Sequence, residues 1–136
     1  MRPLKLWSLG MLGIALAGCT DLGSPVITPV EHGNFVLYVT NQSVNVPLVD
    51  VEVYIDGRLA VNQGFETHSG HTFIRFEYNI EAGTHTIRVR SKYVPEFQSK
   101  DFTLSTTPFV VVAFWSSPGD ASHFEIDFFA SQPSWE

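Results

Sequence analysis

Histidine and acidic residues near the middle of the chain have the spacing that a metal site would need. His68 and His71 are three positions apart in a glycine-containing segment, and Glu66 precedes them. Imidazole and carboxylate groups bind metal ions when several of them converge on one point. His68 and His71 are therefore candidate metal ligands, and the alternative is that both are solvated loop residues.

Basic residues form a second pattern. If residues 72–91 form a hairpin in the pairing that their apolar positions favour, Arg75 lies opposite Arg88. Arg90 is then diagonal to Arg75, and Lys92 continues the same face. Like charges that face one another destabilise a sheet, so we expect an anionic partner: a lipid headgroup, a cell-wall carboxylate or an acidic protein surface. The alternative is neutralisation of this basic stripe by acidic residues of neighbouring strands, namely Asp101, Glu77, Glu96 and Glu52.

Recognised catalytic patterns are absent from the sequence. It contains no Gly-x-Ser-x-Gly elbow, no His-Glu-x-x-His zinc motif and no glycine-rich phosphate loop. No spacing links a serine or an acidic residue to a histidine in a known triad order. We therefore predict a protein that is not an enzyme and that needs no cofactor.

The N-terminus has the three parts of an export signal. Arg2 and Lys5 supply positive charge, residues 6–16 are apolar apart from Ser8, and the run Leu-Ala-Gly-Cys ends at Cys19. The apolar stretch is too short to span a bilayer. Leu-Ala-Gly-Cys at this place resembles the lipobox of bacterial lipoproteins, which implies cleavage before Cys19 and lipid on its thiol. The alternative is an ordinary secretory signal that contains a cysteine.

Cys19 is the only cysteine, so the exported domain is expected to fold without a disulfide. Thr20 follows it, where aspartate would resemble an inner-membrane retention signal. We therefore expect a location in the cell envelope, at the periplasmic face of the outer membrane rather than the inner one. Residues 1–18 are the predicted signal peptide, 19–33 the lipidated cysteine with a flexible tether of about 45 Å, and 34–136 the folded domain.

Composition limits the partners of that domain. The signal removes two of the eight basic residues and none of the 14 acidic ones, which leaves a formal charge of −8 on residues 19–136. A surface of that charge argues against binding to nucleic acid. Abundant phenylalanine and β-branched residues favour strands over helices.

Alternation of apolar and polar residues marks the strands. The clearest is 50–55, with Val51, Val53 and Ile55 on one face. Asp56-Gly57 then predicts a hairpin turn. A two-residue turn would place Leu59 and Val61 on the face of Tyr54, a three-residue connection would place them inside, and both registers stay open. The other predicted strands are 35–40, 72–78, 84–91, 100–104, 109–115 and 123–129.

Seven or eight short strands without a helical period predict an all-β fold, a single antiparallel immunoglobulin-like β-sandwich. Residues 109–115 are apolar on both faces and are expected to form a central strand, and Pro95 is expected to interrupt the segment before 100. His85 is expected to pack against Tyr78 at the core edge. Phe128-Phe129 and Trp135 are expected to be partly core, and the remainder of their surface is a candidate partner contact.

Two hairpin-like segments, 53–58 and 82–89, resemble those of PEGA-type and related immunoglobulin-like surface modules. Residues 34–136 are more broadly similar to small bacterial lipoproteins with such a sandwich. The resemblance implies a fold and little about activity. We therefore expect a membrane-anchored interaction module of the cell envelope whose partner is an envelope protein or a cell-wall component. The alternative is a periplasmic binding protein for a metal ion or a small anionic ligand.

Overall fold

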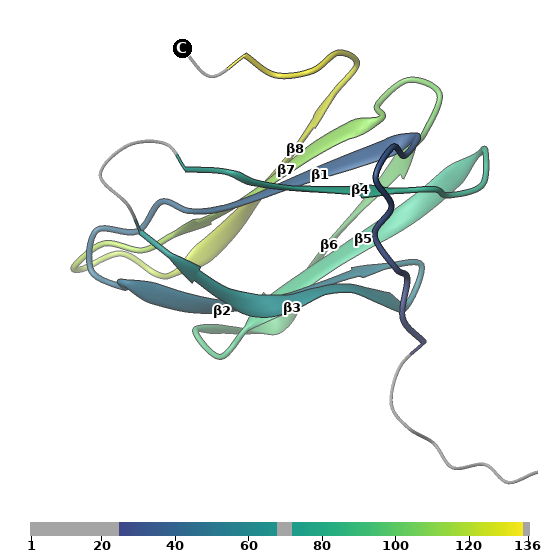
Figure 1. Ribbon diagram of the computed structural model, residues 1–136. Helices are drawn as coiled ribbons and strands as arrows, with labels where there is room; N and C mark the ends of the chain where they lie inside the picture. Colours follow the sequence, from purple (N-terminus) through teal and green to yellow (C-terminus); the bar gives the residue numbers. More distant parts are fainter. Residues whose placement is uncertain (1–24, 68–71, 135–136) are drawn as a thin grey trace, which may run out of the picture.

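The computed structural model describes residues 25–67 and 72–134, which form two four-stranded sheets packed face to face (Figure 1). One sheet has the order β4-β1-β7-β8 and the other β3-β2-β5-β6. The predicted β-sandwich is confirmed, with one exception to its antiparallel pairing, since β1 and β7 run parallel. Among the described residues no helix is long and apolar enough to cross a membrane. The strands are β1 (Phe35–Asn41), β2 (Leu48–Ile55), β3 (Arg58–Glu66), β4 (Ile74–Tyr78), β5 (Thr84–Ser91), β6 (Val94–Thr103), β7 (Phe109–Trp115) and β8 (His123–Phe129).

The core lies between the sheets and follows the alternation of the sequence. In β2 every second residue, including Val51, Val53 and Ile55, is fully buried, and the residues between them are half-buried. Strand β5 alternates in the same way and contributes Ile87 and Val89 to the same core. Side chains that point to one face of each sheet therefore supply most of the buried apolar surface.

The turn between β2 and β3 contains two residues, Asp56 and Gly57. Their φ angles are 50° and 76°, which is the mirror-image geometry that matches the twist of a hairpin. Ile55 pairs with Arg58 directly across the turn. The shorter of the two predicted connections is therefore the right one.

A β-bulge at Ala60 explains why the apolar pattern favoured the longer connection. Tyr54 pairs with Leu59, but Val53 pairs with Val61, so Ala60 is the extra residue. The bulge returns Val61 to the core, where it is 4% exposed. The hydroxyl of Tyr78 donates a hydrogen bond of 2.8 Å to the Ala60 carbonyl, which the bulge would otherwise leave inside without a partner.

The predicted hairpin of residues 72–91 is wrong. Strand β4 pairs with β1 in one sheet, whereas β5 pairs with β2 and β6 in the other. Arg75 lies opposite Tyr38, and Arg88 lies opposite Tyr54. Strands β4 and β5 instead bury their apolar residues in one core from opposite sheets, where Phe76 of β4 contacts Phe65 of β3, and residues 79–83 carry the chain from one sheet to the other. Alternation shows which face of a strand is buried, and both arrangements bury the same faces.

The end of the expected tether is packed on the sandwich. Ile27 is 6% exposed within the core, and the Leu59 N–H donates to the Pro25 carbonyl at 2.7 Å. The Val30 N–H donates to the Glu77 carbonyl at 2.9 Å. This segment covers the seam between the edges of β3 and β4, so the folded part already includes Pro25 and the predicted boundary at 34 is wrong.

Two side chains close the opposite seam, between β6 and β8. The amide of Gln98 accepts from the Phe124 N–H at 2.6 Å and donates to the Phe124 carbonyl at 3.1 Å. The Lys100 ammonium donates to the Ile126 carbonyl at 2.8 Å. These bonds satisfy backbone groups that an edge strand would otherwise offer to another chain. Strand β6 also includes Pro95, which does not interrupt it, because an edge strand tolerates the absence of one N–H.

Gly33→Ala is expected to lower the free energy of unfolding by about 2 kcal/mol, because the new methyl group would displace backbone. A Cβ at Gly33 would lie 2.4 Å from the carbonyl oxygen of Tyr78. Gly64→Ala is the matched control, since its Cβ would meet only the mobile end of the exposed Leu48 side chain, at 2.9 Å. Urea unfolding of both variants tests this, and an equal effect of the two substitutions would contradict it.

Candidate functional site

Several predicted site residues have no described position. Cys19, His68 and His71 lie outside the residues that the structure describes, so lipidation and metal binding there stay predictions. Within the described ranges no group of three or more histidine, cysteine, aspartate or glutamate side chains is arranged to hold a metal ion.

The basic stripe is divided between the two sheets. Arg75 is on β4, where its guanidinium contacts the Glu77 carboxylate at 3.3 Å and lies 5.9 Å from the ring centre of Tyr38. Arg88 and Arg90 remain together on the outer face of the other sheet, and Lys92 follows in the turn after β5. The expected repulsion between Arg75 and Arg88 therefore does not exist.

The three remaining basic residues are partly neutralised. The guanidinium groups of Arg88 and Arg90 both contact the Phe97 ring, at 3.9 and 4.5 Å from its centre. Arg90 donates to Glu52 at 2.6 Å, and this hydrogen bond raises the pKa of Arg90. Lys92 lies 5.2 Å from the centre of the Tyr93 ring. Binding of an anionic partner at this patch stays a prediction.

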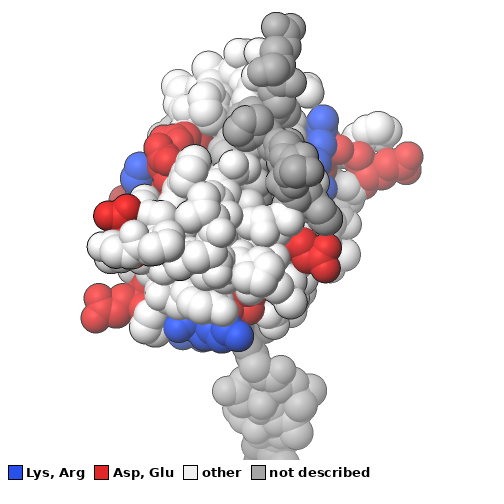
Figure 2. Space-filling model, turned by 90° about the vertical axis from the view of Figure 1, so that its left-hand side faces the viewer, with Lys and Arg blue, Asp and Glu red and all other residues white. Residues whose placement is uncertain are grey.

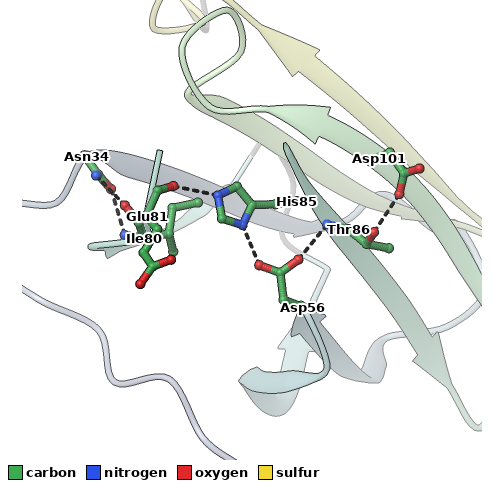
Figure 3. A network of polar contacts seen from close by, with 7 residues as sticks. All are labelled: Asn34, Asp56, Ile80, Glu81, His85, Thr86 and Asp101. Atoms are coloured by element: carbon green, nitrogen blue, oxygen red, sulfur yellow. Dashed lines mark hydrogen bonds and ion pairs between the residues drawn. The ribbon is translucent and has the colours of Figure 1, made fainter. Parts of the chain in front are cut away.

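His85 is the centre of a polar network at the end of the sandwich that holds the β2–β3 turn (Figure 3). Its Nδ1 contacts the Asp56 carboxylate, and its Nε2 is 2.6 Å from the Glu81 carbonyl oxygen. The second oxygen of Asp56 accepts from the Thr86 N–H at 2.9 Å. The ring packs against Phe102, 5.6 Å away between centres, and not against Tyr78 as expected.

Both ring nitrogens of His85 face acceptor oxygens, so only the doubly protonated ring satisfies both contacts. Burial opposes that charge, but the hydrogen bonds to Asp56 and to the Glu81 carbonyl outweigh it and raise the pKa of His85. Arg58 nearby acts in the opposite direction. Because the Glu81 carbonyl occupies Nε2, the ring has no nitrogen ready to take a proton from a substrate. We therefore assign His85 and Asp56 to the structure of this end and not to catalysis.

An extensive hollow surface lies on the outer face of sheet β4-β1-β7-β8. The register of β7 with β8 pairs Trp115 with His123, Ala113 with Glu125, and Val111 with Asp127. An open hollow of about 720 Å³ begins at Trp115 and is lined also by Gln42, Val44, Ser116, Ser117, Asp120, Ala121 and His123.

A second hollow of about 180 Å³ shares Gln42 and Trp115 with the first and continues over the sheet. We call the two together the Trp115 trough. Trp115, Val44 and Phe129 in this trough are 39%, 76% and 37% exposed, so it presents apolar surface to solvent. The remaining residues of the second hollow are Thr40, Phe73, Val111, Ala113, Glu125, Asp127 and Phe129.

Figure 2 looks onto the end of the sandwich where the β1–β2 and β7–β8 loops meet. Uncharged surface fills the centre of this view, acidic side chains lie around it, and basic ones lie towards its margins. Asp120, Glu125 and Asp127 line the Trp115 trough, whereas no lysine or arginine does. The trough is therefore apolar and acidic.

Only part of this surface could be predicted from the sequence. Phe128 and Phe129 were predicted together, as partly core and partly a candidate partner contact. The structure separates them, since Phe128 packs against the core and Phe129 is exposed. Trp115 was assigned to a central strand, which β7 is, but the outer face of that strand is open at Trp115. No protein-family model, curated protein or solved structure matches the chain.

Proposed function

We propose that this chain is a non-catalytic interaction module of the bacterial cell envelope, anchored through lipid on Cys19. The observation that supports it best is the Trp115 trough, a hollow apolar surface on the outer face of a sheet whose strands are already paired and whose core is already filled. Contiguous exposed apolar surface of this kind is typical of a binding site.

The place of the trough suits an anchored protein. The described chain begins at Pro25, beside Leu59 and the β2–β3 turn, at the right of Figure 1. The β1–β2 and β7–β8 loops, which contribute to the trough, lie at the opposite end. Five residues separate Cys19 from Pro25, so the anchored domain would begin within roughly 20 Å of the lipid. The end of the trough at Trp115 and Val44 would then lie on the side of the domain away from the membrane.

A substitution tests the anchor separately from the trough. Cys19→Ser is expected to abolish labelling by a palmitate analogue and to release the protein from membranes, because a single lipidated thiol carries the anchor. Retention of label or membrane association in this variant would contradict the anchor.

Photocrosslinking in intact cells tests the trough. A benzophenone amino acid is placed at Phe129 in the trough and, as a control, at Tyr93, which belongs to neither hollow; these side chains are 37% and 41% exposed. We expect Phe129, and Val44 at the other end of the trough, to give an adduct of the same mass, and Tyr93 to give none. Equal adducts at all three positions, or none at Phe129 and Val44, would contradict the proposed function.

A further inference from the structure

The outer residues of β8 form a row along the Trp115 trough. His123, Glu125, Asp127 and Phe129 alternate with the core-facing residues of the strand. Alternate residues of a strand are about 6.8 Å apart, which is also the repeat of side chains on any extended peptide. An extended segment laid along this row would place every second side chain over one of its residues.

Glu125 and Asp127 leave negative charge on the row, and the nearby Lys100 ammonium donates to the Ile126 carbonyl between them. Glu125 and Asp127 are exposed and form no ion pair in the part of the chain that the structure describes. Trp115 and Phe129 supply exposed aromatic surface beside them. An aromatic ring attracts a cation to its face, and a carboxylate attracts it more strongly still.

We propose that the Trp115 trough binds an extended segment of a partner protein that carries lysine or arginine at alternate positions. This inference rests on the proposed function, which it makes specific. Basic side chains of the segment lie over Glu125 and Asp127 and against the rings of Trp115 and Phe129. Its backbone does not add a strand to the sheet, because Gln98 and Lys100 already occupy the carbonyls of Phe124 and Ile126 at the free edge of β8.

Charge excludes two other occupants of the trough. A second copy docked symmetrically would bring Glu125 and Asp127 of both chains together, and like charges at an interface are unfavourable. An anionic lipid surface would be repelled for the same reason. Lysine or arginine on a partner protein is the complementary chemistry.

The test uses the full chain purified from membranes in non-ionic detergent, and a fluorescent nonapeptide in which lysine alternates with threonine. We expect binding, measured by fluorescence anisotropy, to weaken about tenfold when Glu125→Gln and Asp127→Asn are combined, since two exposed ion pairs with the peptide are lost. The control combines Glu81→Gln with Glu96→Gln, two exposed residues outside the trough, and changes the net charge equally. This control is expected to bind within about twofold of the unmodified chain.

Comparison of two peptides, and competition with a glycan, identify what occupies the trough. A peptide of the same composition with its lysines in two blocks is expected to bind more weakly than the alternating one, because its charges do not match the row. Trp115→Leu is expected to weaken the alternating peptide about threefold, through loss of the ring. Three outcomes would each overturn the proposal. The first is that the trough double variant and the control double variant weaken binding equally, and the second is that both peptides bind equally. The third is that tetra-N-acetylchitotetraose displaces the peptide. Crosslinking at Phe129 is independent of these outcomes, so a failed inference is distinguishable from a failed function.

Discussion

Asn41→Ala is expected to lower the free energy of unfolding by about 4 kcal/mol, because four hydrogen bonds converge on one buried amide and each group left unsatisfied costs about 1–3 kcal/mol. Asn41 is 5% exposed at the end of β1. Its Nδ2 donates to the carbonyls of Val46 and Phe65 at 2.9 and 3.0 Å, and its Oδ1 accepts from the N–H and hydroxyl of Ser43 at 3.0 and 2.7 Å. The amide thereby joins the β1–β2 loop to the edge strand β3.

Two controls separate this network from general disturbance of the loop. Asn41→Asp keeps the two accepting contacts with Ser43 but places a carboxylate beside two carbonyls, so it is expected to destabilise at least as much as Asn41→Ala. Gln42→Ala, at the neighbouring half-buried position, is expected to cost less than about 1 kcal/mol. Urea unfolding of the three variants measures this. An Asn41→Ala protein within 1 kcal/mol of the unmodified one would contradict the assignment.

Asn41 also connects stability to the trough. The loop that it holds contains Gln42 and Val44, which line the hollow beside Trp115. An Asn41→Ala protein that remains folded at low temperature is therefore expected to lose peptide binding, although the substituted side chain lines neither hollow. Loss of binding without contact to the ligand would identify the loop as part of the site.

The strands themselves could be predicted because alternation depends on neighbours in the sequence. Val51, Val53 and Ile55 are buried as their pattern requires, and the predicted last strand coincides with β8. The pairing of the strands could not be predicted in the same way. The apolar faces of β4 and β5 are buried whether the strands are neighbours in one sheet or belong to opposite sheets of the sandwich, so local pattern does not distinguish the two arrangements.

The predicted start of the folded domain at residue 34 was wrong for a different reason. A segment rich in proline and glycine forms no regular structure, but regular structure is not needed for burial. Ile27 is buried in the core and its N–H donates to the Leu59 carbonyl, although Pro25 and Pro29, two positions to either side, prevent a strand pattern. Composition therefore described the conformation of residues 25–33 and not their contacts.

The Trp115 trough could not be predicted from the sequence because its walls come from three strands, β1, β7 and β8, and from three connections between strands. Thr40, Ala113 and Glu125 become neighbours only once the parallel pairing of β1 with β7 is known. A crossover that joins β1 to β7 in one sheet has no local signature. The prediction of a basic stripe was wrong for the same reason, because the pairing of the strands was unknown. Arg75 belongs to the same sheet as the trough and not to the sheet of Arg88.

His85→Ala is expected to lower the free energy of unfolding by about 3 kcal/mol near pH 6, through the loss of a charged hydrogen bond and of packing against Phe102. The side chain is 8% exposed, and the Asp56 carboxylate that it contacts is 39% exposed. Because water reaches that carboxylate, we expect only about 1 kcal/mol of the effect to depend on pH.

The direction of that dependence follows from the two pKa shifts. The pKa of His85 is raised above 6.5 in the folded protein, so its contribution is complete below pH 6.5 and is lost as the pH rises through the folded pKa. For Asp56, burial opposes the shift, but the hydrogen bonds from His85 and the Thr86 N–H lower its pKa below 3.8. The contribution of Asp56 is therefore present above pH 3.8 and is lost as the pH falls. The difference in stability between the unmodified and His85→Ala proteins should be largest between these two values.

Asp56→Asn is the matched control for the charge. Asparagine tolerates the positive φ of this turn position, and its side-chain oxygen can still accept from the Thr86 N–H. The variant should therefore keep the turn but lower the pKa of His85, as followed by the ring proton resonance of His85 in a pH titration. Urea unfolding across the same pH range should then show a smaller difference between Asp56→Asn proteins with and without His85. An unchanged pKa of His85 in Asp56→Asn would show that the carboxylate does not hold the imidazolium at this end of the sandwich.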